Sequence, residues 1–152
     1  MHTQVITKFA VASDKMLDEL LYLLRTWMSE HPEVVPAGTY TRKILVNTMN
    51  SFSSQWLIVY AGDEPAGFAF LTDGGERPAI FDHKRVVQLA AFGVLEAYAG
   101  GAAETSLLEK CMTIYKGRDA IWTLPAAANR AFLESGGFVQ HAATPYWVKE
   151  QL

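Results

Sequence analysis

Two adjacent glycines, Gly100 and Gly101, stand in the stretch "EAYAGGAAETSLLEKC", which runs from Glu96 to Cys111. Small residues leave the backbone accessible, and the first N–H groups of a following helix have no partner within that helix. Together with the positive end of the helix dipole, these groups bind phosphate. The stretch therefore suggests an anion-binding loop, although a carboxylate, Glu104, lies inside it.

The bulk composition limits the classes of protein to consider. A chain of 152 residues has the length of one domain, so we expect 1–152 to form a single domain. The formal net charge of -3 argues against nucleic-acid binding, which needs clustered Lys and Arg. The apolar runs are too short to span a membrane. One cysteine, Cys111, and the lack of a signal-peptide pattern favour a cytoplasmic protein.

Hydrophobic periodicity predicts the elements that position this loop. Before it we expect a strand at 4–11, a helix at 14–31 that is N-capped by Ser13, and a second helix at 41–49. An antiparallel hairpin of strands 55–61 and 66–72 follows, and then a central strand at 85–94 that is buried on both faces. After the loop we expect a helix that stops before residue 117 and a strand at 120–124. A helix at 126–135 and two strands at 138–143 and 146–150 complete the chain. This order predicts an α/β fold with a central mixed sheet flanked by helices.

The sequence from Val94 to Phe138 resembles the GNAT superfamily of N-acetyltransferases. In that family the central strand runs into a loop of pattern Arg/Gln-x-x-Gly-x-Gly/Ala, followed by a helix with a Leu-Leu pair. Here Tyr98 stands where an aromatic residue commonly precedes the loop, and "LLEKC" follows at the expected distance. Farther on, "ANRAFLESGGF" is similar to the family's Asn, Phe-Tyr-Glu-Lys and Gly-Phe segment. The N-terminal third matches only in the order of its elements.

This resemblance implies an enzyme that moves an acetyl group directly from acetyl-CoA to the amine of a small molecule or a protein. It also implies which residues contact coenzyme A. They are Phe92, Gly93, Val94, Ala99, Gly100, Gly101, Ala102, Ala103, Glu104, Asn129 and Phe132. For Asn129, capping of a helix N-terminus explains the residue type equally well.

The loop departs from the family pattern, so we interpret it as a degenerate coenzyme A loop. With Tyr98 and the Leu-Leu pair kept in place, Ala99 occupies the Arg/Gln position, while Ala102 and Glu104 replace the two small residues. A second alignment places Gly100 and Ala102 at the glycine positions but lengthens the spacing to the Leu-Leu pair by two residues, and we favour the first. The Glu104 carboxylate either points to solvent or takes the place of a phosphate. We favour the outward orientation, because the family's loop binds mostly through its backbone.

No catalytic residue is identified from the sequence. Family members often carry a Glu base on the central strand and a Tyr acid on the last helix, but the matching positions hold Gln88 and Leu133. Neither side chain can transfer a proton at neutral pH. Asp82, His83 and Glu96 lie near the ends of the central strand, and none is a compelling substitute. The histidines show no metal-ligand spacing.

Three functional hypotheses therefore remain. The first, which we favour, is an active N-acetyltransferase whose partner is an amine substrate. The second is a GNAT-fold binding or structural module that has lost acetyl-CoA binding and catalysis. The third is an unrelated α/β domain in which the loop is only a turn. The aromatic end of the chain, Tyr146 and Trp147, fits either a core or a homodimer contact.

Overall fold

The protein, described here as a computed structural model, is defined for residues 4–31, 40–73, 78–82, 84–124, 130–141 and 144–150. Seven strands form one mixed sheet in the order β1-β2-β3-β4-β5-β7-β6. The strands are β1 (Val5–Phe9), β2 (Ser54–Ala61), β3 (Glu64–Thr72), β4 (Val86–Val94), β5 (Ala120–Thr123), β6 (Val139–Gln140) and β7 (Trp147–Glu150). The helices are α1 (Asp14–Glu30), α2 (Arg42–Met49), α3 (Ala102–Ile114) and α4 (Arg130–Ser135). Among the described strands, only the β4–β5 pair is parallel.

The predicted α/β class and the order of elements are confirmed. The two edge strands are shorter than predicted: 4–11 reduces to Val5–Phe9, and 138–143 reduces to Val139–Gln140, with residues 142–143 outside the described part. The β1 ladder ends at the Phe9–Leu57 pair although β2 continues to Ser54, and β6 pairs with only two residues of β7. Hydrophobic periodicity along the sequence does not reveal where the pairing of an edge strand ends.

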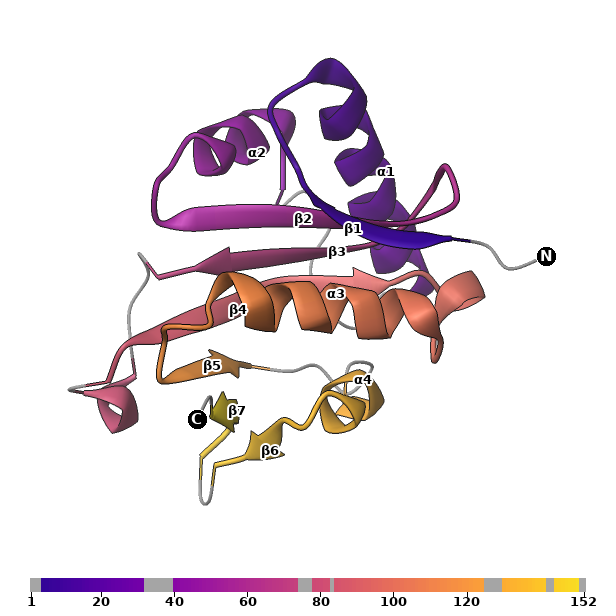
Figure 1. The fold of residues 1–152 in the computed structure, drawn as a ribbon. Helices are drawn as coiled ribbons and strands as arrows, with labels where there is room; N and C mark the ends of the chain where they lie inside the picture. Colours follow the sequence, from indigo (N-terminus) through magenta and orange to yellow (C-terminus); the bar gives the residue numbers. More distant parts are fainter. Residues whose placement is uncertain are drawn as a thin grey trace.

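Side-chain alternation along β2 assigns each face of the sheet to a different set of helices. Leu57, Val59 and Ala61 pack in one core cluster with α3 and α4. The intervening residues of β2, among them Trp56 and Ile58, pack in a second cluster with α1 and α2. Figure 1 shows α3 lying along one face of the sheet, with α1 and α2 at the opposite face.

A β-bulge at Ala90 interrupts the regular alternation of the central strand β4. Leu89 pairs with Leu71 and Ala91 pairs with Phe70, so Ala90 has no partner on β3. The extra residue keeps Leu89 and Phe92 on the same face although they are three positions apart. Ala90 is exposed, so the prediction of a strand buried on both faces throughout is wrong at the bulge.

Candidate functional site

The central strands β4 and β5 separate immediately before the bulge. Their parallel pairing ends at Gln88 and Trp122. The next carbonyl on β4, that of Leu89, accepts a hydrogen bond of 2.7 Å from the buried hydroxyl of Thr123. From Ala90 onward, no described residue forms a ladder with the edge of β4 that faces β5. The sheet therefore presents backbone N–H and C=O groups to whatever lies between the two strands.

The predicted contact residues on β4 point to opposite faces of the sheet. Phe92 and Val94 face α3 and α4, and the Phe92 ring lies 5.3 Å, centroid to centroid, from the ring of Phe132. The two predicted residues Phe92 and Phe132 are thus brought into contact. Gly93 faces α1, where an added Cβ would lie 2.6 Å from Cδ1 and from Cε2 of Trp27. Gly93 is consequently explained by packing against the indole.

The predicted phosphate loop is shorter than its sequence suggested, because α3 begins at Ala102. Gly101 is the N-cap residue and offers no side chain for capping. The N–H groups of Ala102, Ala103 and Glu104 have no hydrogen-bond acceptor within the described part of the chain. Three backbone donors therefore remain unsatisfied at the positive end of a 13-residue helix.

Glu104 turns back into the loop. Its Oε2 accepts a hydrogen bond of 2.6 Å from the N–H of Gly100, and its side chain is half-buried. Our preferred prediction, that this side chain points to solvent, is wrong. The physical reason is local: a Glu at the third position of a helix reaches the N–H groups just before the helix and satisfies a donor that nothing else reaches. Gly100, at φ 76°, adopts the left-handed conformation that presents its N–H to the carboxylate.

The loop residues line a hollow of about 360 Å³ at the start of α3. Ala99, Gly101, Ala102 and Ala103 contribute to its wall, together with residues of β1, β2 and the turn that precedes the loop. Among these is Tyr98, which is half-buried and packs against both large core clusters. The structure thus gathers four of the predicted residues around one cavity. Asn129 lies outside the described residues.

The positions matched to an acid and a base remain without proton-transfer chemistry. Gln88 is half-buried in the last rung of the β4–β5 ladder, and Leu133 is fully buried. Glu96 is exposed, and its N–H donates to Oε1 of Glu30 at 3.0 Å. Asp82 is also exposed, and His83 lies outside the described residues. No base or acid is therefore assigned.

The described part of the chain gives little support for a reactive cysteine or a metal site. Burial raises the pKa of the Cys111 thiol to about 12, which agrees with the predicted buried, unreactive cysteine. Within the described ranges, no group of three or more His, Cys, Asp or Glu side chains is arranged to hold a metal ion. None of the helices described is long and apolar enough to cross a membrane.

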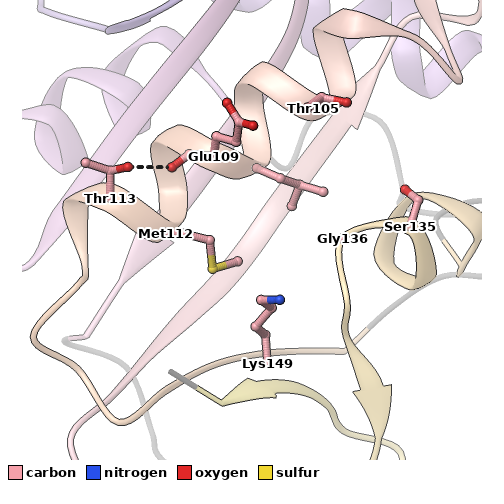
Figure 2. A pocket seen from close by; sticks show the side chains of 8 residues that line it. Thr105, Glu109, Met112, Thr113, Ser135, Gly136 and Lys149 are labelled. Carbon is pink, nitrogen blue, oxygen red and sulfur yellow. Dashed lines mark hydrogen bonds between the residues drawn. The ribbon is translucent and has the colours of Figure 1, made fainter. Parts of the chain in front are cut away.

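A second hollow, of about 520 Å³, lies between α3, the turn after α4, and β7. In Figure 2 the Lys149 side chain rises from β7 toward Met112 on α3, and Gly136 forms part of the opposite wall. An added Cβ on Gly136 would lie 2.5 Å from Cδ1 of Leu108, so a larger residue at this turn would require the Leu108 side chain to move. None of the predicted site residues lines this second hollow.

Sequence reasoning missed three residues at the site. The bulge at Ala90 has a signal in the sequence, since the apolar spacing changes from two residues (Val87 to Leu89) to three (Leu89 to Phe92). Thr123 also carries a weak signal, as a hydroxyl residue at the end of a short apolar strand. For Glu30 there is none, because its contact with Glu96 joins segments 66 residues apart.

Comparison with known proteins shows what this arrangement is similar to. No family model and no curated protein sequence matches the chain. A structure of PaiA N-acetyltransferase from Thermoplasma acidophilum in complex with coenzyme A superposes with a TM-score of 0.73 at 15% identity, covering 97% of this chain and 98% of that one. An acetyltransferase of the GNAT family from Streptococcus pneumoniae gives a TM-score of 0.67 at 14% identity, covering 98% and 100%.

A third similar structure is an aminoglycoside acetyltransferase from an uncultured soil metagenomic sample, in complex with sisomicin. It gives a TM-score of 0.66 at 10% identity and covers 88% of this chain and 85% of that one. Similarities at these identities establish the fold. The chain has the fold of the GNAT superfamily of N-acetyltransferases.

Proposed function

We propose that this protein is an N-acetyltransferase that moves an acetyl group from acetyl-CoA to an amine. The observation that carries the proposal is the separation of β4 and β5 at Gln88 and Trp122, directly before the bulge at Ala90. A pantetheine arm is an extended chain with two amide groups, which can hydrogen-bond to a free strand edge in the way that a further strand does. Its diphosphate would then reach the N–H groups at the start of α3.

The residues proposed to contact coenzyme A have distinct roles. Phe92 and Phe132 form an apolar wall beside the arm, and Thr123 closes the β5 end of the opening by bonding to Leu89. The backbone of Ala102 and Ala103 holds phosphate. We also propose contacts with the backbone of Gly93 and Val94, with loop residues Ala99, Gly100, Gly101 and Glu104, and with Asn129.

The chemistry proposed is direct transfer. The neutral amine attacks the thioester carbonyl, a C–N bond forms and the C–S bond breaks; the nitrogen loses one proton and the leaving thiolate gains one. Because Gln88 and Leu133 supply no base or acid, rate acceleration comes from holding the amine and the thioester in reacting geometry. Solvent then carries the proton between the two groups.

The acceptor is proposed to be an amine of a small molecule or a protein. The aminoglycoside acetyltransferase bound to sisomicin shows that a similar fold accommodates a small amine ligand. A formal net charge of -3 also favours cationic over anionic acceptors, although only weakly. We further propose that the protein is cytoplasmic, that 1–152 forms a single domain, and that it assembles as a homodimer.

A second candidate function is a GNAT-fold binding or structural module without catalysis. Glu104 favours it, because its carboxylate already occupies the Gly100 N–H in the loop. The buried Leu133 at the expected acid position favours it as well. Binding of acetyl-CoA separates the two functions.

The test combines binding with transfer. A ligand at a hundred times its dissociation constant adds about 2.7 kcal/mol of stability, which for a chain of this size raises Tm by about 5–11 °C. Release of the free thiol in the presence of a panel of amines then reports transfer. Cys111 does not interfere with a thiol reagent, because it is buried. No thermal shift at millimolar acetyl-CoA would refute the proposal.

Two variants at one position test whether α3 holds the phosphate. Ala102 is exposed and is the first residue of the helix, where proline fits the backbone but lacks an N–H. Ala102→Pro should weaken acetyl-CoA binding by about tenfold or more, since a hydrogen bond to a charged group contributes about 1.5–3 kcal/mol. Ala102→Ser keeps the N–H and should bind like the parent protein. Equal affinities for both variants would place the phosphate elsewhere.

A further inference from the structure

The loop before α3 has little capacity for negative charge. Between Val86 and Glu109 the chain contains no Lys, Arg or His, while Glu96 and Glu104 add two carboxylates around the loop. A diphosphate is normally neutralised by cationic side chains as well as by backbone N–H groups. Along this segment of the chain no cationic side chain is available to neutralise it.

Glu104 reduces even that capacity. Its carboxylate holds the Gly100 N–H at 2.6 Å, and the N–H groups of residues 101–104 have no acceptor among the described residues. These neighbouring N–H groups suffice for the oxygens of one phosphate. A second phosphate beside the first would have to displace the carboxylate or lie next to it, and like charges at that separation repel.

The strand separation that would receive the arm is present in the same structure. β4 and β5 separate after Gln88 and Trp122, and Phe92 and Phe132 provide an apolar wall. The features suited to a pantetheine arm are therefore present, while the features suited to a diphosphate are reduced. This chain therefore fits the pantetheine end of coenzyme A better than the diphosphate end.

We infer that the preferred acyl donor is a thioester on a pantetheine arm with a single phosphate, and that Glu104 selects against the diphosphate of coenzyme A. This inference rests on the proposed function. The shared chemistry is acylated 4′-phosphopantetheine, either free or attached to a carrier protein through its phosphate. Acetyl-CoA remains a donor, but a weaker one.

Three donors with the same thioester test the inference: acetyl-pantetheine, acetyl-4′-phosphopantetheine and acetyl-CoA. By calorimetry on the full chain, we expect acetyl-phosphopantetheine to bind about tenfold tighter than acetyl-pantetheine, because its phosphate gains about 1.4 kcal/mol from the helix donors. We expect it to bind at least as tightly as acetyl-CoA. Tighter binding of acetyl-CoA than of acetyl-phosphopantetheine would overturn the inference and leave the proposed function standing. Binding of none of the three would refute the proposed function itself.

Glu104→Gln separates charge from shape, since the amide oxygen still accepts from Gly100. It should raise the affinity for acetyl-CoA by about fivefold, which corresponds to a quarter of the repulsion between charges 4 Å apart at an effective dielectric near 20. The affinity for acetyl-pantetheine should stay unchanged. Glu109→Gln, an exposed carboxylate on the same helix, is the matched control and should change neither affinity. An equal gain in both variants would show that overall charge, and not Glu104, sets the preference.

The source of the arm is settled by a fourth donor, a carrier protein that bears the same acetylated arm. Tighter binding than the free acetyl-phosphopantetheine would identify a carrier protein as the donor. Weaker binding would identify the free thioester. A failure of Glu104→Gln to discriminate between acetyl-CoA and acetyl-pantetheine would overturn the role of Glu104 whichever source is used.

Discussion

Replacing Gly93 with alanine tests the packing that fixes the central strand against α1. Gly93 lies on β4, and an added Cβ would lie 2.6 Å from two ring carbons of Trp27 and close to its Nε1. Carbon atoms in van der Waals contact are about 3.5–4.0 Å apart, so the ring or the strand must move by about 1 Å.

Neither partner can move freely. The Trp27 side chain is 4% exposed, and its ring also contacts the edge of Phe68 at 6.0 Å between centroids. On its other side, Gly93 approaches Gly67, where an added Cβ would lie 2.7 Å from the Gly93 carbonyl oxygen. Overpacking of a well-packed core costs about 1–3 kcal/mol. For a chain of this size, Gly93→Ala should therefore lower Tm by about 2–12 °C.

Urea denaturation followed by tryptophan fluorescence measures the free energy of unfolding, with Gly117→Ala as the control. An added Cβ on Gly117 meets nothing within 4 Å, so that variant should unfold like the parent protein. A double-mutant cycle with Trp27→Leu then isolates the steric term. Removing the indole should relieve much of the cost of Gly93→Ala, giving a coupling energy of about 1 kcal/mol or more.

The reasoning fails if Gly93→Ala changes stability by less than about 0.5 kcal/mol, the size of an ordinary surface substitution. It also fails if the Gly93→Ala cost is the same with and without Trp27. Loss of acetyl-CoA binding without loss of stability would instead show that the proposed contact with coenzyme A, and not packing against Trp27, explains the glycine at position 93.

Three other measurements check separate parts of the structure. Thr123→Val removes the hydroxyl that bonds to the Leu89 carbonyl and leaves a buried acceptor unsatisfied. The free energy of unfolding should therefore fall by about 1–3 kcal/mol. Unchanged stability would show that water replaces the hydroxyl. Burial raises the pKa values of Cys111 and Tyr115 to about 12, from 9.0 and 10.0, so both groups ionise at lower pH in the unfolded chain than in the folded one. Stability should therefore fall as pH rises from 9.0 to about 12. A flat profile of stability against pH would contradict this. Gly100 has φ 76° and open space around its Cα, so Gly100→Ala should lower stability by about 1–2 kcal/mol through backbone strain alone. Gly100→Asn should lower it less, because Asn tolerates that conformation. Equal losses would rule out backbone strain as the cause.

The sequence by itself determined the order and type of the elements. Helical spacing of leucines with caps at Ser13 and Thr41, and β-rich runs around a turn, are local patterns, because neighbouring residues share the same helix face or strand. The position of the loop between the central strand and α3 followed from the same patterns. The resemblance from Val94 to Phe138 added the fold, which the comparisons confirm.

Only the tertiary structure decided how the site is built. At the point where β4 and β5 separate, the Thr123 hydroxyl meets the Leu89 carbonyl, 34 residues away. The orientation of Glu104 depended on which donor lay within reach, and that was set by the left-handed backbone at Gly100. Such contacts are geometric, so residue type and spacing list the candidates, whereas the folded backbone selects among them.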